Sequence, residues 1–512
     1  MILLHGSQTS KIDPYDPRFL ALVQASQKIA EKDASSWGPA AQEEASIRLN
    51  WVDSPQTSRA LLPELDALAA RYRAFSRVVL CGMGGSSLAP EVIAASFEKD
   101  LFVLDSTDPD YIAHALNGDL SKTVVVVSSK SGSTVETASQ RALFEWQFTN
   151  AGLNPTDHMV IVTDPGSPLD KDARTRGFAV VNADPNVGGR FSALTAFGLV
   201  PAALLGIDVS VLLDAASDVL PSFQGNQSPA VAAAFMLAYQ SGQYLAFSDT
   251  DSGMPGLSDW IEQLIAESTG KEKVGRLPIV LESQSSPIGG EGMRISFSGK
   301  SDLVIEGDLG SQFIFWEWVT ALLGFALEID PFNQPNVTEA KEQTASLLTA
   351  WAGKLPKFTP NFVDGAVEIF ADASTVQDAL TKVIDAVSPD GYIAVMAYLD
   401  RKGDEELAQL RRILAEKSSR PVTFGWGPRF LHSTGQFHKG GQQNGVFLQI
   451  TGEPSLDIEI PGKEFTFKTL IAAQALGDGQ ALSSRGLTVV RLHLRDRDNG
   501  IAEILSAARA II

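Results

Sequence analysis

The sequence predicts an α/β protein with parallel β-sheets that helices cover on both faces. Short Val-rich apolar runs begin at Arg77 and alternate with segments of helical periodicity. The runs are continuously apolar, as strands buried on both faces are. A second set of such runs follows a helical stretch in the middle of the chain, which predicts a second sheet of the same class.

The first set of strands closes near Ile207 and consists of the runs RVVLCG, LFVLDST, TVVVVSS, HMVIVTD and FAVVNAD. Before it, residues 1–75 carry two helical patterns, near 18–30 and 58–75, and no site motif. We therefore expect an N-terminal helical segment over 1–75 and a first α/β domain over 76–210.

A helix is expected over 231–247, ahead of the second set of strands. The runs of that set are LPIVLES, DLVIEG, GYIAVMAYLD, PVTFGWG, GVFLQIT and LTVVRLHLR, with a last helix near 501–512. These runs predict a second domain over 211–360 and a C-terminal α/β lobe over 361–512.

The amino-acid composition and the net charge indicate which kinds of molecule the protein can bind. The chain has 512 residues, 44% hydrophobic and 20% charged, and a net charge of −20, which is ordinary for a globular protein apart from its acidity. The acidity argues against nucleic acid as a partner. A phosphate ester would need local positive charge in its site, because the overall field repels it.

Cysteine usage and apolar segments bear on location. Cys81 is the only cysteine, which excludes an intrachain disulfide and fits a reducing compartment. The first residues lack the pattern of a secretory signal, and the apolar runs are too short or too broken to cross a bilayer. We therefore expect a cytoplasmic protein with no membrane partner.

The sharpest motif is SSKSGSTVETA, in which a buried strand ends and a helix begins near Val135. Free N–H groups at a helix start bind anions. Candidate phosphate ligands are Ser129, Lys130, Ser131 and Thr134, with Gly132 allowing the backbone to curl. The alternative is a Ser-rich turn that only caps the helix.

A second Gly-rich turn, VVLCGMGGSSLAPEV, precedes this motif. Gly82, Gly84 and Asp105 partly match a dinucleotide-binding fingerprint, but Ser87 stands where the third glycine is expected. Alternatively, Gly85 and Ser86 help to hold a small sugar phosphate.

One carboxylate falls on an apolar helix face. In LSDWIEQLIAESTG, Trp260, Leu264 and Glu267 share a stripe, whereas Glu262 points the opposite way and is expected to be solvated. A carboxylate on a core-facing stripe needs a partner or a chemical role. A proton-transfer role and a capping role at the following turn both remain open for Glu267.

Two cations stand in comparable places. Lys341 shares a stripe with Val337 and Thr344 behind a predicted Asn336–Glu339 capping box, and either meets an anion or snorkels to solvent. Arg190, in GGRFS after a strand, could stabilise a developing oxyanion or pair with an acid such as Asp184.

Only two of the six histidines cluster, His432 and His438 in GWGPRFLHSTGQFHKGG. Without Cys or nearby carboxylates they make a poor metal site, so no metal is expected.

Taken together, five segments resemble phosphoglucose isomerase in the family's order: GMGGSSLAP, SSKSGSTVETA, GGRFS, WIEQLIAESTGK and PFNQPNVTEAK. The resemblance implies two flavodoxin-like sugar-isomerase (SIS) domains, often dimeric, that interconvert glucose 6-phosphate and fructose 6-phosphate without a cofactor. It also implies site residues. Glu267 would move the proton between C2 and C1, and Arg190 would stabilise the enediolate. Lys341 would assist ring opening or substrate orientation, with Gln263 and Gln334 nearby.

The tail, LHSTGQFHKGGQQNGVFLQIT, resembles the isomerase part of transaldolase–isomerase fusion proteins, which implies a transaldolase as partner or fusion. The family's ring-opening histidine is missing between Glu267 and Lys341, where Phe313 stands instead. We therefore expect the C-terminal lobe to fold back and present His438, or as second choice His432, to the site. The alternative is that both are ordinary loop residues.

Two other functions stay open at this point. A non-catalytic sugar-phosphate-binding regulator would keep the Ser129–Thr134 loop but has no use for Glu267, Arg190 and Lys341 together. A dinucleotide-dependent oxidoreductase would use the second Gly-rich turn.

Overall fold

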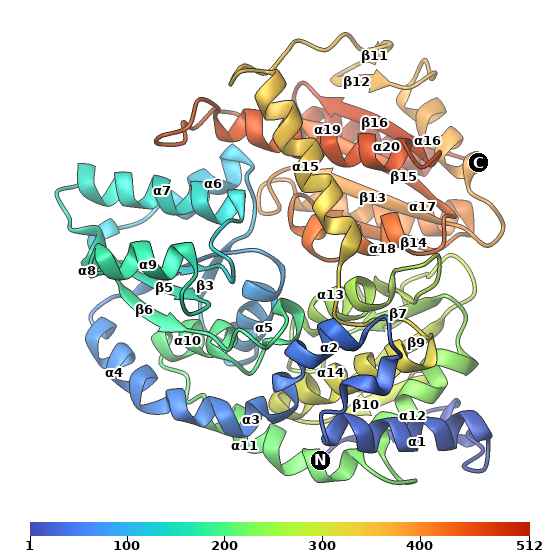
Figure 1. Ribbon diagram of the computed structural model, residues 1–512. Coiled ribbons are helices and arrows are strands. Elements are labelled where there is room, and N and C mark those ends of the chain that lie inside the picture. The colour runs from blue at the N-terminus through green and yellow to red at the C-terminus, as the bar shows by residue number, and fades with distance from the viewer.

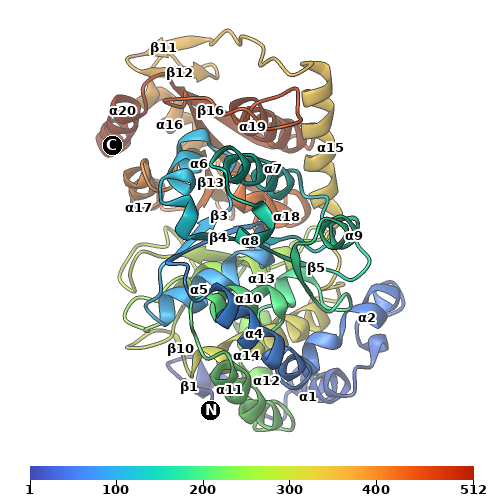
Figure 2. The same cartoon turned by 90° about the vertical axis from the view of Figure 1, so that its left-hand side faces the viewer.

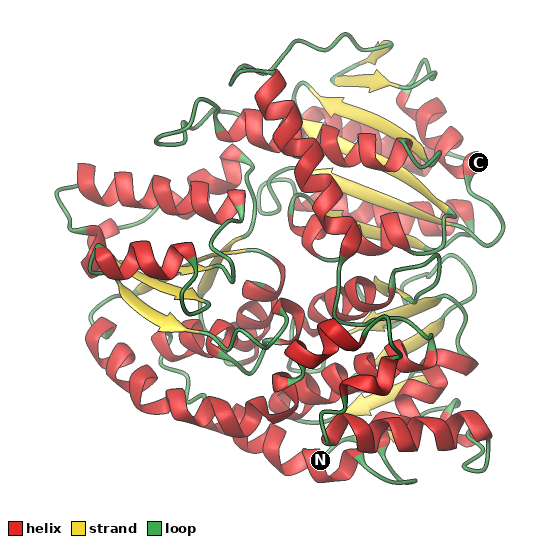
Figure 3. Ribbon diagram, in the orientation of Figure 1, coloured by secondary structure: helices red, strands yellow, loops and turns green.

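Three β-sheets, each flanked by helices, form the protein in the computed structural model, which describes residues 1–512 apart from the side chain of Val337 (Figures 1 and 3). The sheets come from residues 77–182, from residues 244–306 with one short strand near the N-terminus, and from residues 362–494. Four helices precede the first sheet: α1 (Pro17–Ala30), α2 (Gln42–Arg48), α3 (Ser54–Thr57) and α4 (Leu62–Tyr72).

The first sheet is entirely parallel, in the order β3-β2-β4-β5-β6, and its strands coincide with the five predicted runs. They are β2 (Arg77–Gly82), β3 (Leu101–Leu104), β4 (Thr123–Ser128), β5 (Met159–Thr163) and β6 (Ala179–Asn182). The helices between and after them are α5 (Leu88–Ser96), α6 (Pro109–Leu116), α7 (Val135–Asn150), α8 (Pro155–His158), α9 (Pro168–Thr175) and α10 (Ala196–Leu204).

The second sheet has the order β1-β10-β9-β7-β8, with only β1 antiparallel. Its strands are β1 (Leu3–His5), β7 (Tyr244–Ser248), β8 (Leu277–Val280), β9 (Met293–Ser296) and β10 (Leu303–Glu306). Its helices are α11 (Ser210–Val219), α12 (Pro229–Phe235), α13 (Leu257–Thr269), α14 (Leu309–Ala326) and α15 (Pro335–Ala350).

The helix expected over 231–247 is wrong in its second half. The helical conformation ends at Gln240, after a π-helical turn, and Tyr244 to Phe247 form part of β7. Ser241 and Gly242 break the helix, and the apolar run that follows is a fully buried strand, which periodicity alone does not distinguish from a buried helix.

The third sheet has the order β11-β12-β16-β15-β13-β14, in which the four strands from β16 to β14 are parallel and β11 and β12 pair antiparallel. The strands are β11 (Phe362–Asp364), β12 (Val367–Phe370), β13 (Tyr392–Tyr398), β14 (Val422–Trp426), β15 (Gly445–Gly452) and β16 (Thr488–Leu494). The helices are α16 (Val376–Ala386), α17 (Gln409–Ser418), α18 (Gly435–Gly440), α19 (Phe467–Ser483) and α20 (Arg497–Ala510).

The three sheets share one winding. In each, the first parallel strand lies between the second and the third, as in β3-β2-β4, β8-β7-β9 and β14-β13-β15. Ligands of open α/β sheets bind beyond the carboxyl ends of the strands, at this reversal of strand order.

Shared cores join the three parts. One apolar cluster runs from the N-terminal helices through the first two sheets, and smaller clusters pack the third part against the first and against the second. Helix α15 leaves the second part and runs beside α19 of the third (Figures 1 and 2). No helix in the described part of the chain is long and apolar enough to span a bilayer.

Candidate active site

The centre of the site is an ion pair between the first two parts of the chain. Arg190 Nη1 lies 3.3 Å from Glu267 Oε1, near the end of α13. The arginine also donates to Ser268 Oγ at 2.7 Å, to Gln334 Oε1 at 2.8 Å and to the Pro331 carbonyl at 2.6 Å. Its partner is therefore Glu267, not Asp184, and this network holds the buried guanidinium in one orientation.

The glycines of the GMGG turn allow three segments to meet at this pair. A Cβ on Gly85 would lie 2.0 Å from the Gly189 carbonyl oxygen, beside Arg190. One on Gly84 would lie 2.7 Å from Gln263 Nε2. The turn thus needs glycine for close backbone packing.

Asp105, the acidic residue of the partial dinucleotide fingerprint, has protein partners. Its carboxylate lies 2.8 Å from Arg429 Nη1 and 3.5 Å from Arg401 Nε. A carboxylate paired in this way is not available to a ribose hydroxyl, so the dinucleotide hypothesis loses its main support.

A cavity of about 250 Å³ opens next to the SSKSGST loop. Ser133, Thr134 and Glu136 line it from the start of α7, Lys341 from α15, and His432 from the C-terminal lobe. Thr134 is the N-cap residue of α7 and its side chain makes no capping bond, so the first N–H groups of the helix are available to an anion.

The predicted phosphate ligands take different places in the loop. Ser129 Oγ accepts the Gly132 N–H at 3.1 Å, and the Ser131 and Ser133 hydroxyls lie 2.7 Å apart. Lys130 does not line the cavity, because its Nζ pairs with Asp164 Oδ2 at 2.8 Å and donates to the Pro185 carbonyl at 3.1 Å. Of the two lysines named from the sequence, Lys341 is the one that lines the cavity.

His432 occupies the position that the sequence analysis gave first to His438. Its Nε2 lies 3.1 Å from Glu136 Oε1, and Gln474 Nε2 donates to the same carboxylate oxygen at 2.8 Å. Burial acts to raise the pKa of Glu136, but His432 and the hydrogen bonds outweigh it, so the pKa is lowered.

The structure does not place His438 at the site, contrary to what the sequence led us to expect. Its ring stacks on Tyr392, and Nδ1 lies 2.8 Å from the Tyr392 hydroxyl, inside the core of the third part. Burial lowers the pKa of His438 to about 3, so this ring is neutral near pH 7 and has a packing role.

Gln436 explains how the C-terminal lobe reaches the site. Its Nε2 donates to the Gly270 carbonyl at 2.9 Å and to Asn336 Oδ1 at 2.8 Å, while its Oε1 accepts the Asn336 N–H at 3.0 Å. This one buried amide joins the end of α13 to the start of α15. A second link is Gln263 Nε2, which donates to Glu267 Oε2 at 3.1 Å and to the His432 carbonyl at 2.8 Å.

Two local predictions are wrong. Glu262 is buried, not solvated, and burial together with Asp259 raises its pKa well above the ordinary value. The Asn336–Glu339 capping box does not form, because Asn336 is hydrogen-bonded to Gln436 and Glu339 pairs with Arg485. Partners from the C-terminal lobe thus replace the expected capping box.

Sequence reasoning missed Lys271, which is 2% exposed. Its Nζ donates to the Asn333 carbonyl at 2.7 Å and to the Asp330 carbonyl, and burial holds its pKa well below the ordinary value. It fixes the same 330–333 turn that holds Arg190. The quoted segment WIEQLIAESTGK contains it, but no periodicity marks it. The side chain of Val337, named with the Lys341 stripe, lies outside the described residues.

The family model described as phosphoglucose isomerase matches residues 67–292. This part, somewhat less than half of the chain, is similar to phosphoglucose isomerases. The match contains the SSKSGST loop, Arg190 and Glu267, and ends before Lys341 and His432. The recognition made from the motifs is therefore confirmed.

Curated relatives agree over the same region. A probable glucose-6-phosphate isomerase of Haloarcula marismortui is 33% identical over 39% of this chain and 48% of its own length. A glucose-6-phosphate isomerase of Cyanothece is 36% identical over 39% of this chain and 41% of its own length. The chain thus matches about half the length of these relatives or less.

The fold has a counterpart among solved structures. A glucose-6-phosphate isomerase from Chlamydia trachomatis aligns with a TM-score of 0.52 and 20% identity, covering 65% of this chain and 84% of that one. This likeness confirms the expected sugar-isomerase fold class.

Proposed function

We propose that this chain interconverts an aldose 6-phosphate and a ketose 6-phosphate, with glucose 6-phosphate and fructose 6-phosphate as the pair. The observation that carries the proposal is the Arg190–Glu267 ion pair, which Gln263 links to His432 at the edge of the loop-lined cavity. Aldose–ketose isomerisation needs one base that returns the proton it takes and a cation that stabilises the enediolate.

In this proposal Glu267 takes the proton from C2 of the open-chain aldose and returns it to C1. O1 gains a proton and O2 loses one, so no external oxidant or reductant is needed. Arg190, held by Ser268 and the 330–333 turn, stabilises the negative charge on the enediolate oxygens. Gln334, which accepts from Arg190, helps to hold this geometry.

The phosphate group would lie at the start of α7. Ser129, Ser131 and Thr134, with Gly85 and Ser86 of the neighbouring turn, form the set of ligands proposed for it. Lys341 supplies the positive charge in the cavity, while Lys130 acts through its ion pair with Asp164, which fixes the loop.

Ring opening is assigned to His432 with Lys341. Both line the cavity, and Glu136, itself held by Gln474, fixes the imidazole. A histidine suits proton transfer at the ring oxygen because its ordinary pKa lies near neutrality. This assignment replaces the earlier one to His438.

The test is turnover of fructose 6-phosphate in EDTA, measured by coupling product formation to a glucose-6-phosphate dehydrogenase. When the reaction is run in D2O, the product should carry deuterium from the solvent, since the transferred proton exchanges while it is on Glu267. Saturable binding of fructose 6-phosphate without turnover would instead identify a sugar-phosphate-binding regulator. A homodimer and a transaldolase partner remain family-based predictions, which sedimentation and co-purification can test.

A further inference from the structure

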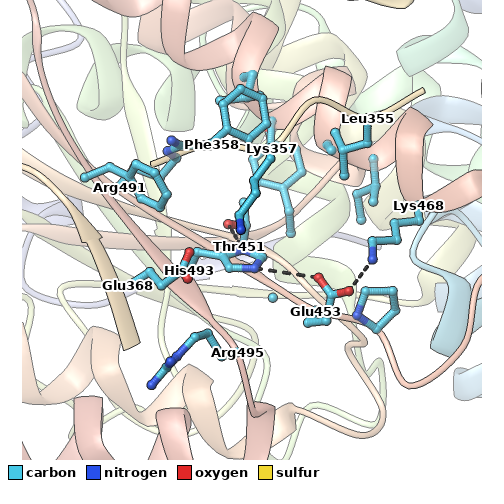
Figure 4. Close-up of a pocket in the computed structure, with 18 of the residues that line it drawn as sticks. Leu355, Lys357, Phe358, Glu368, Thr451, Glu453, Lys468, Arg491, His493 and Arg495 are labelled. Carbon is cyan, nitrogen blue, oxygen red and sulfur yellow. Dashed lines mark hydrogen bonds and ion pairs between the residues drawn. The ribbon is translucent and has the colours of Figure 1, made fainter. Parts of the chain in front are cut away.

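A second cavity, of about 300 Å³, lies entirely within the C-terminal part (Figure 4). Its walls are the ends of β15 and β16, one face of α19, and the segment 355–358 that follows α15. It shares no lining residue with the cavity beside the SSKSGST loop. Its size is within the range of small-molecule sites.

The charge of this cavity is opposite to that of the protein. Four lysine and arginine side chains line it against two glutamates, in a chain of net charge −20: Lys357, Lys468, Arg491 and Arg495 against Glu368 and Glu453. Glu453 is already engaged, since its carboxylate pairs with Lys468 and lies 3.9 Å from His493 Nε2 (Figure 4). The other cations therefore dominate the field inside the cavity.

Among these cations, Arg491 gives the clearest indication of an anion-binding site. Its Cζ lies 3.7 Å from the centre of the Phe370 ring and 5.4 Å from that of Phe358. These rings fix the guanidinium, but within the described residues its side chain makes no hydrogen bond and no ion pair, with Glu368 or any other acid. Five N–H donors fixed by aromatic rings and left without acceptors are suited to an anionic group.

The charge of Arg491 and the apolar walls of the cavity narrow the chemical class of the ligand further. Burial lowers the pKa of Arg491 to about 10, so the group is still cationic near pH 7. Most of the remaining wall is apolar, from Leu355, Phe358, Ile471 and Leu476. A bare sugar phosphate has no apolar surface to cover these side chains.

We propose that this cavity binds an organic anion with an apolar body, its phosphate or carboxylate head held by Arg491 and Lys357. The body covers Phe358 and the α19 side chains Ile471 and Leu476. The site is distinct from the isomerase site and its existence does not depend on the proposed activity. Because α15 carries Lys341 near its start and leads into the 355–358 wall, such a ligand would contact the segment that follows the helix lining the isomerase cavity.

The test uses the full chain and calorimetric titration with phenyl phosphate and, separately, benzoate. Phenol and inorganic phosphate report the contributions of body and head alone. Arg491→Met keeps an unbranched chain and removes the charge, and should weaken binding about tenfold or more, as the loss of a charged hydrogen bond does. Arg412→Met, at an exposed arginine that pairs with Glu416 on α17, is the matched control and should bind as wild type.

Each outcome has a defined meaning. Phenyl phosphate bound equally by wild type and Arg491→Met, or displaced completely by excess fructose 6-phosphate, would overturn the proposal. The absence of saturable binding of either probe at millimolar concentrations would overturn it as well. If Arg491→Met does not fold, the exposed Lys357→Met variant decides, and unchanged affinity there counts against the site. A preference for phenyl phosphate over benzoate identifies the head group as a phosphate.

Discussion

The two sides of the candidate active site are built in different ways. The side that contains Arg190 and Glu267 comes from the first two parts of the chain, which share one apolar core and meet where Gly84 packs closely against Gln263. The side that contains His432 comes from the C-terminal lobe and is held by Gln436 and by ion pairs. In the proposed function, proton transfer and ring opening would therefore have separate structural supports.

The family match divides the molecule along the same line. It covers the first side and stops at residue 292, before any residue of the second. The contact between the lobes is electrostatic at its edge: Arg429 lies 2.6 Å from Glu91 and 2.8 Å from Asp105. Burial acts to raise the pKa of Glu91, but Arg429 and Arg401 outweigh it and lower the pKa to about 2. Damage to one side should therefore leave a different residual activity from damage to the other.

The largest effect is expected on the first side. Glu267→Gln should lower kcat by about 10²–10⁴-fold with little change in substrate affinity. A positioned proton-transfer group typically accelerates a reaction by that factor. Glu262→Gln, five residues earlier on the same helix, is the matched control. Burial raises the pKa of Glu262 well above the ordinary value, which favours the neutral carboxyl that an amide resembles. Steady-state kinetics of the two variants check this, and turnover retained by Glu267→Gln would remove the base from the mechanism.

The first side could be predicted from sequence because its signals are local. Val-rich runs predicted every strand of the first sheet, and the helical stripe placed Glu267 correctly on the buried face. The position of Lys130 could not be predicted, because its partner Asp164 lies 34 residues away on another loop. Likewise, periodicity predicted a solvated Glu262, since it does not reveal that the C-terminal lobe covers that face of α13.

The second side depended on tertiary contacts that motifs do not encode. The expectation that the tail supplies a histidine agrees with where the lobe lies, but the choice between two histidines six residues apart required the structure. His438 follows the pattern Gly-Gln-Phe, yet it belongs to the short helix α18 and faces Tyr392. His432 precedes that helix and faces Glu136.

The second prediction separates the two histidines. His432→Gln should lower turnover of cyclic glucose 6-phosphate by about tenfold to 10²-fold, toward the low end for acid–base groups because the ring also opens in solution. A four-carbon aldose 4-phosphate cannot close a ring through its phosphorylated oxygen, so its isomerisation should be nearly unchanged. Parallel kinetics with both substrates measure the ratio.

His438→Gln is the matched control for this pair. It should lower the melting temperature, because it breaks the stacked pair with Tyr392 inside the core, and should keep both activities in the protein that remains folded. The assignment of ring opening would have to move if His432→Gln lowered both activities equally, or if His438→Gln alone reduced turnover of the cyclic sugar.

The third prediction compares two residues of the SSKSGST loop. Thr134→Ala should raise KM for fructose 6-phosphate by about two- to tenfold, the value of one hydrogen bond, with kcat little changed. Lys130→Met should raise KM less, because its amine faces Asp164 instead of the cavity. Inhibition by inorganic phosphate, measured for both variants, gives an independent check. A larger effect for Lys130→Met would mean that the loop rearranges when substrate binds.

The smallest effect is expected where the C-terminal lobe docks. Burial raises the pKa of Asp259 to about 6, with Asp249 and Glu91 acting in the same direction and Arg429 and Arg401 against it. Between the ordinary carboxyl pKa and about 6 the folded state binds more protons than the unfolded state, so this group lowers stability as pH rises through that window. Asp259→Asn removes the titration and should raise the melting temperature by about 1–3 °C at pH 8. The gain should be mostly lost near pH 4, where the folded wild-type carboxyl is neutral and the unfolded one is only partly ionised. Scanning calorimetry of both proteins at the two pH values makes the comparison.

A variant that melts lower than wild type at pH 8 would show that attraction to Arg429 outweighs burial, and that the contact between the lobes gains stability from this charge.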